Sequence, residues 1–102
     1  MVRDYREDEN VDVAAKMANL IAPLSFAQIE RMTIDAIREH RAALAKAETA
    51  YHSWKEAQAA HLETVAERHK EYTKLMLAAT VQQMVLATLV ERLGFIPHVP
   101  PD

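Results

Sequence analysis

The amino-acid sequence predicts an all-α protein, and three observations carry the prediction. No proline and no glycine occur between Pro23 and Gly94, so the strongest loop-forming residues are missing from most of the chain. The residues that fill this stretch are mainly Ala, Glu, Lys, Arg, Leu and Gln, which are good helix formers. Apolar residues recur there at intervals of three and four. We therefore expect an antiparallel hairpin of two long helices, preceded by a short helix.

The short N-terminal helix is expected over residues 10–22. Its apolar positions share one helical face, with Asp8 or Asn10 as a possible cap. The helix should end before Pro23, because the residue ahead of a proline disfavours helical geometry. Residues 1–9 carry many charged side chains, and we expect them to be ill-ordered.

The first long helix has a clear start signal. Ser25 can cap it, and Gln28 three residues later completes a capping box. Leu24 and Ile29 have the spacing of a hydrophobic staple across the same helix start. The apolar face of this helix is then formed by Phe26, Ile29, Met32, Ala36, Ile37, Ala43, Leu44, Ala47, Tyr51 and Trp54.

The start of the second long helix is open to two interpretations. Ser53 to Glu56 and Thr64 to Glu67 are both capping-box patterns, and neither follows a glycine. The end is better defined, because Gly94 suits the left-handed position past a helix and Pro97 prevents its resumption. One unbroken helix over 25–93 is an alternative supported by a seven-residue apolar series, but a lone helix of about 100 Å is rare.

The end of the chain is expected to pack on the helices. Gly94 should direct the pair Phe95 and Ile96 back against the bundle, and Arg92 complements the helix dipole in the last turn.

Residues 1–102 are expected to form one domain that needs a second copy. The run from Leu75 to Val90 carries no charged side chain, and a helix that is apolar on most sides needs several neighbours. The run is shorter than the roughly 20 apolar residues that span a bilayer, so a buried helix is favoured over a membrane span. We expect a homodimeric, coiled-coil-like helical bundle whose interface is formed by Leu77, Val81, Met84, Val85 and Leu89.

The amino-acid composition limits the classes of partner and the cellular location that the chain can be expected to have. The net charge is -3 without a long basic block, which argues against nucleic acid or an anionic membrane as a direct partner. The chain has no cysteine, and its first residues are acidic rather than typical of a secretory signal. These features favour a cytoplasmic protein.

No pattern of catalytic residues is evident, and we expect no catalytic site, no cofactor and no metal. The five histidines lack the spacing of a zinc motif, and the only glycine is a helix stop rather than part of a phosphate loop. Ser25 and Ser53 are better explained as helix caps than as nucleophiles. His52 and Glu56 are the one pair whose spacing would allow both to bind a metal ion. A position on a solvated helix face is the strongly favoured interpretation of the pair.

Two stretches resemble a known family. Residues 33–41, TIDAIREHR, and residues 93–97, LGFIP, are similar to the TraM antiactivators of plasmid quorum sensing, and the separation between the two blocks is similar too. The resemblance implies a homodimer of helical hairpins. It also implies a partner, TraR, a transcription factor of the LuxR type that dimerises on an acyl-homoserine lactone and activates conjugal transfer. By this resemblance the chain blocks DNA binding by the activator and binds no lactone itself.

The resemblance also suggests contact residues. Tyr72 matches a family tyrosine and Leu20 an apolar family position, while Asp35 and Arg38 lie on the exposed side of the first block. A core or dimer role for Tyr72 is equally favoured. The chain departs from the family between Trp54 and Arg68, where it has neither the proline nor the glycine that members can carry.

Two other classes of protein remain as alternatives. A helical coiled-coil adaptor or chaperone would show the same periodicity without the two blocks. A DNA-binding repressor would need a basic recognition helix, which the sequence lacks.

Overall fold

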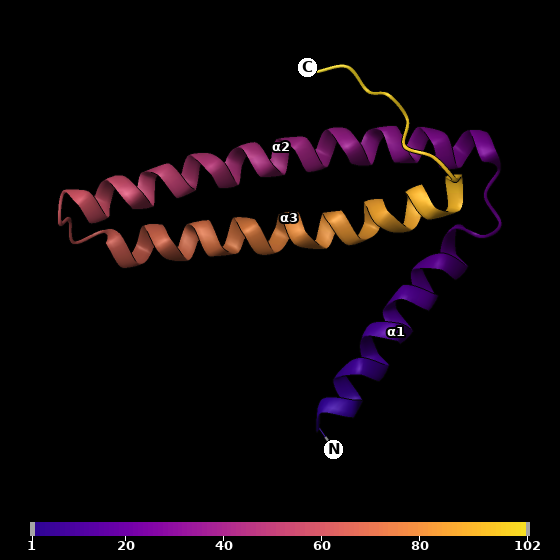
Figure 1. Ribbon diagram of the computed structural model, residues 1–102, viewed down its shortest axis with the longest axis horizontal. Coiled ribbons are helices and arrows are strands. Elements are labelled where there is room, and N and C mark those ends of the chain that lie inside the picture. The colour runs from indigo at the N-terminus through magenta and orange to yellow at the C-terminus, as the bar shows by residue number, and fades with distance from the viewer. Residues whose placement is uncertain (1, 102) are drawn as a thin grey trace.

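A computed structural model describes the backbone of residues 2–101 and the side chains of residues 12–101. This part of the chain forms α1 (Val2–Ile21), α2 (Phe26–Ala59) and α3 (Val65–Leu93), and it contains no strand. α2 and α3 lie antiparallel and side by side, while α1 leaves the open end of this pair at an angle (Figure 1). The predicted all-α hairpin with a preceding helix is confirmed.

The first helix is longer than predicted. It begins at Val2 rather than at residue 10, because no helix-breaking residue precedes Pro23 and Asp8 and Asn10 continue the helix instead of capping it. Its end at Ile21, ahead of Pro23, agrees with the prediction. The backbone of the segment expected to be ill-ordered, residues 1–9, is helical from Val2 onward, while Met1 and the side chains up to residue 11 lie outside the described residues.

The start of α2 is built as the sequence predicts. Ser25 has extended backbone angles, and its Oγ accepts a hydrogen bond from the Gln28 N–H at 3.2 Å. In return the Gln28 Oε1 accepts from the Ser25 N–H at 2.9 Å, which completes the capping box. Leu24 packs against the cluster that contains Ile29, as a staple should.

The turn between α2 and α3 rules out a single unbroken helix, and it uses neither predicted capping box. Ser53 lies inside α2, and Thr64 precedes α3 without a side-chain cap bond. Instead His61 takes a left-handed backbone, with φ of 52°. The His61 N–H donates to the Gln58 carbonyl at 3.2 Å and the Leu62 N–H to the Ala57 carbonyl at 3.0 Å. These two bonds form a Schellman motif, in which glycine is the usual left-handed residue.

The end of α3 follows the prediction. Gly94 has φ of 93°, and its N–H donates to the Val90 carbonyl at 2.8 Å. Arg92 also has a role that its position in the last turn does not reveal, because its Nη2 donates to the Ala22 carbonyl at 3.2 Å. This bond ties the end of α3 to the segment that follows α1.

Residues 95–101 form a strap that crosses α2 and ends on the side of α2 opposite α3 (Figure 1). Phe95 lies against Phe26, with the ring centroids 6.2 Å apart, and Pro97 and Val99 are buried. Arg41 fixes the far end of the strap, because its guanidinium donates to the carbonyls of Val99 at 2.6 Å and Pro100 at 2.9 Å. The expected packing of the pair is wrong for Ile96, which is 74% exposed, and only partly met by Phe95, which is 45% exposed. Side chains of an extended segment point alternately to opposite sides, and here Pro97 and Val99 take the inward positions.

The core of the hairpin is thin and concentrated at its two ends. At the open end Ile29, Leu89 and Leu93 form an aliphatic cluster with Ile21, Leu24 and Ala36 packed on it. At the turn end aromatic rings stack between the helices. Between these ends lie buried alanines, Ala47 and Ala79, which bury little area. The one buried polar side chain on the described core, Thr33, donates to the Ile29 carbonyl at 2.7 Å.

The protein is flat. Its extents are 52 × 46 × 15 Å, and the shortest of these is close to the diameter of a single helix with its side chains. The chain therefore supplies one layer of helices, whereas a stable domain buries its apolar faces between two or more.

Candidate interaction surface

Exposed apolar side chains gather on the side of α3 that faces away from α2. We call this surface, formed by Leu77, Val81, Met84 and Val85, the outer edge of α3. Leu77 and Val81 are the most exposed, at 64% and 59%. These four residues belong to the predicted dimer interface, and the structure leaves all of them uncovered within the chain.

Leu89, the fifth residue of the predicted interface, lies elsewhere. It is 3% exposed and packs with Ile29 and Leu93 in the core of its own hairpin. The correction has a simple cause. α3 is apolar around most of its circumference, so its sequence alone does not show which stripe α2 covers.

Judged by length and composition alone, α3 is long and apolar enough to cross a membrane. Its most apolar window has a mean hydropathy of 1.3, and 11% of that window is buried. Core helices meet the same criterion when they are mostly buried, and the small buried share of α3 reflects its uncovered outer edge. α3 packs along α2, a helix that carries many charged side chains. The outer edge of α3 is therefore the exposed side of a packed hairpin.

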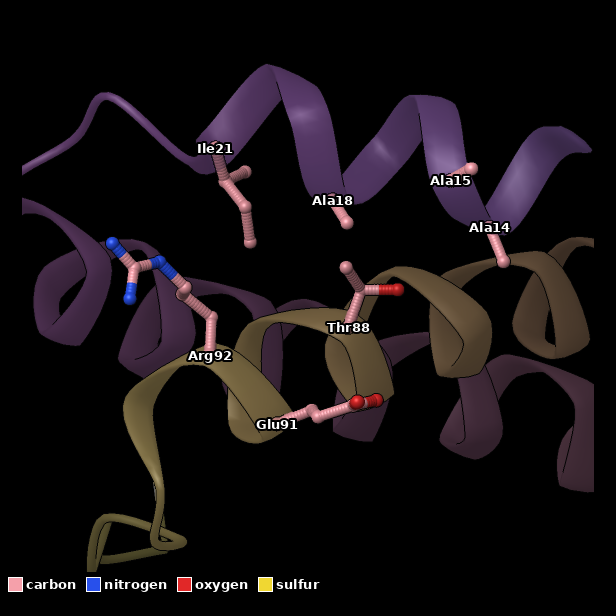
Figure 2. Close-up of a pocket in the computed structure, with 7 residues that line it drawn as sticks. All are labelled: Ala14, Ala15, Ala18, Ile21, Thr88, Glu91 and Arg92. Carbon is pink, nitrogen blue, oxygen red and sulfur yellow. The ribbon is translucent and has the colours of Figure 1, made fainter.

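A hollow opens where α1 meets the hairpin. Figure 2 shows Ala18 and Ile21 pointing from α1 toward α3, where Thr88 faces them. Beside it lies an apolar groove of about 320 Å³, lined by Met17, Leu20, Ile21, Leu24, Met32, Val85, Thr88 and Leu89. Leu20, one of the predicted partner-binding residues, is 76% exposed in this groove.

Asp35 and Arg38 lie on a different surface. Both are exposed on α2, where they line a shallow hollow together with Arg31 and Ile34. This surface mixes charges of both signs with an apolar residue, which is the composition of an interface rim.

Tyr72 is half-buried in the aromatic cluster at the turn end. Its ring stacks on Trp54 with centroids 5.6 Å apart and lies 5.5 Å from the ring of Tyr51. Trp54 also contacts His69, at 4.4 Å between centroids. Tyr72 thus joins α3 to α2, and the structure gives it a packing role whether or not it also meets a partner.

The described side chains contain no group of three metal-ligating residues. The neighbour of His52 is Glu48 rather than Glu56, with 3.7 Å between His52 Nε2 and Glu48 Oε1. Both side chains are largely exposed, so they belong to a solvated helix face.

The two sequence blocks come together in space. Arg41 closes the first block, and it binds the two carbonyls of the strap that continues the second block. The sequence gives no local signal for this contact, because its partners are 58 and 59 positions apart.

A model of the family described as Prokaryotic Transcriptional repressor TraM matches residues 1–98. The chain belongs to the TraM family. A transcriptional repressor TraM of Agrobacterium fabrum (strain C58) is 30% identical over 82 residues, which cover 80% of each chain. A transcriptional repressor TraM of Rhizobium radiobacter is 32% identical over 96 residues, which cover 91% of this chain and 94% of that one. No solved structure matches the chain.

The match confirms the resemblance that residues 33–41 and 93–97 indicate, since both blocks lie within it. The TraM family is one of transcriptional repressors and not a class of enzyme.

Proposed function

We propose that this TraM-family protein is a quorum-sensing antiactivator. It binds a TraR-type activator of the LuxR family in the cytoplasm and prevents the activator from binding DNA, so that plasmid conjugal-transfer genes stay silent. The observation that carries this proposal is the family match over residues 1–98, which contains both blocks of the predicted resemblance.

The physical route is occupancy. A protein that binds only the DNA-free state of an activator lowers DNA binding in proportion to its different affinities for the two states. Once activated receptor exceeds the antiactivator, free receptor accumulates and transcription begins. This titration requires neither a lactone site nor a catalytic group on the antiactivator.

The contact surface is proposed to combine an apolar anchor with charged side chains. Leu20 supplies the anchor, since it is 76% exposed beside an apolar groove. Asp35 and Arg38 supply exposed charges on α2. Tyr72 joins this list on the resemblance alone, because its ring is engaged by Trp54.

The protein is proposed to act as a homodimer through the outer edge of α3. The chain exposes 7838 Å², whereas a compact monomer of 11.6 kDa exposes about 5800 Å². The difference, about 2000 Å², falls within the area that each protomer of an obligate homodimer buries. The thickness of 15 Å supports the same conclusion, because a second copy supplies the missing layer.

Co-expression with a lactone-loaded TraR-type activator tests the proposal. Size exclusion should show a stable complex, and purified protein in molar excess should abolish the activator's operator shift. Charge reversal at the proposed contacts, Asp35→Arg with Arg38→Glu, should weaken the complex. Lys46→Glu with Glu48→Arg is the matched control, since it also leaves the net charge unchanged and both side chains are exposed on the same helix outside this surface.

An unchanged operator shift in the presence of excess protein would sink the antiactivator proposal for that activator. The coiled-coil adaptor would then become the working hypothesis. The protein alone should bind no duplex DNA, because Arg38 and Arg41 alternate with acidic residues such as Glu39. Salt-sensitive micromolar binding in an anisotropy titration would instead favour a direct repressor.

A further inference from the structure

We propose that α1 is a clasp for a second copy of this chain. The outer edge of the partner's α3 seats in the wedge between α1 and α3, so that each protomer's α1 covers the other protomer. This inference rests on the homodimer of the proposed function and assigns a role to a helix that otherwise projects from the hairpin.

The wedge is a built feature of the chain. α1 meets α3 only near the ends of both helices, and from there the two diverge (Figure 1). The junction is held by the bond from Arg92 to the Ala22 carbonyl and by the packing of Ile21 and Leu24 on the open-end cluster. The link from α1 to α2 is short and contains Pro23, so α1 is joined to the hairpin at a close junction rather than carried on a long linker.

α1 carries two neighbouring apolar stripes, and its own hairpin covers neither of them completely. Ala18 and Ile21 face α3 (Figure 2). Val13 and Met17 share the other stripe, on which Met17 lines the groove beside Val85 and Val13 is 44% exposed. Leu20 is left to the activator contact proposed above. A helix with so wide an apolar stripe needs a second neighbour, and the hairpin does not provide it.

An α3 helix from a second copy would cover the apolar side chains on both sides of the wedge, those of α1 and those of α3. It would cover Val13 and Met17 on α1 while meeting Val81 and Val85 on α3. Folding of α1 onto its own α3 would instead cover part of the outer edge of α3 within one chain. It would leave the chain one layer thick, so it would not supply the second layer between which a stable domain buries its apolar faces.

A charge placed on the exposed side of α1 tests the clasp. Val13→Glu should raise the dimer dissociation constant roughly tenfold or more in sedimentation equilibrium, because it puts a carboxylate into a desolvated interface. Leu62→Glu is the matched control: Leu62 is 43% exposed against 44% for Val13, and it lies in the turn at the opposite end. Equal dissociation constants for the two variants would overturn the clasp.

Cross-linking gives a second measurement that does not depend on affinity. Because the natural chain has no cysteine, only the introduced cysteines can react. Chains carrying Val13→Cys are mixed with chains carrying Val81→Cys and treated with a short bis-maleimide. The clasp predicts a product of dimer mass that contains one chain of each kind. A doubly substituted chain that instead forms an internal link at monomer mass would show α1 closing on its own α3, contrary to the proposal.

The clasp and the homodimer fail in different ways. If the wild-type protein is a dimer in light scattering, but the cysteine variants give no product between positions 13 and 81 and Val13→Glu does not weaken the dimer, the homodimer stands and the clasp is overturned. Wild-type protein that is monomeric overturns both. Cosedimentation of such a monomer with phosphatidylcholine–phosphatidylglycerol vesicles would identify a membrane surface as the cover of α3.

Discussion

The two ends of the hairpin are stabilised in different ways. The turn end is closed by rings that are close in sequence, with Tyr51, Trp54 and Tyr72 stacked between α2 and α3. The open end gathers α1, the strap and both long helices around an aliphatic cluster, and it still leaves Leu20 and Val85 exposed. The difference shows that one end of the hairpin is packed by rings from the two long helices alone, whereas the other end gathers segments from the whole chain and still exposes apolar side chains.

The largest effect is expected in the open-end cluster. Leu89→Ala removes a side chain that is 3% exposed, and it should lower the free energy of unfolding by about 2–4 kcal/mol in urea denaturation. Leu62→Ala, at an exposed turn position, should change it by less than about 0.5 kcal/mol. Similar losses for the two variants would mean that the open end has no aliphatic core of its own.

The turn end should respond next. Tyr72→Ala removes a half-buried ring that stacks on Trp54, and a loss of about 2 kcal/mol is expected from burial and ring contacts together. Tyr72→Phe keeps the ring and should stay within about 0.5 kcal/mol of wild type. Fluorescence of Trp54, the single tryptophan, reports the same contact. Full stability of Tyr72→Ala with weaker capture of the activator would assign Tyr72 to the partner surface instead.

The end of α3 depends on a left-handed glycine. A Cβ at Gly94 would meet no atom within 4 Å, so any cost of substitution comes from its φ of 93° alone. Gly94→Val should therefore cost about 1–2 kcal/mol, measured as a lower melting temperature. Gly94→Asn should recover part of this loss, because asparagine tolerates the left-handed region. A melting temperature of Gly94→Val equal to that of wild type would show that the helix ends in another conformation.

The smallest effect is expected at the end of α2, where a histidine takes the position that glycine takes in α3. His61 has φ of 52°, so His61→Gly should stabilise the protein by up to about 1 kcal/mol. His61→Ala keeps the Cβ and should stay within about 0.5 kcal/mol of wild type. A destabilised His61→Gly would indicate that the imidazole itself holds the turn.

Local signals in the sequence predict the helix boundaries that depend on neighbouring residues. The capping box of Ser25 and Gln28 and the helix stop at Gly94 both form as expected. α3 does begin next to Thr64, yet the threonine side chain makes no cap bond, so the boundary arises from the turn at His61 rather than from the predicted capping box.

The sequence pattern does not predict features that depend on residues far apart in the chain. Periodicity identifies Leu77, Val85 and Leu89 as apolar helix positions, but only the packing of α2 shows that Leu89 is covered and the other two are not. The contact of Arg41 with the strap joins segments nearly sixty positions apart. Nothing in the residues next to an arginine on a helix surface indicates such a distant partner. Leu20 and Arg38 were placed by the resemblance, and their contacts with an activator stay a prediction.

The bond from Arg41 to the strap also has a consequence for the order of folding. Loops that close few residues form early, and contacts between distant segments form only after the chain between them is organised. The turn end brings together residues about twenty positions apart, whereas Arg41 binds carbonyls 58 and 59 positions away. The hairpin should therefore form from its turn toward its open end. The strap should pack on α2 last, because its contact with Arg41 requires that the two long helices have already paired.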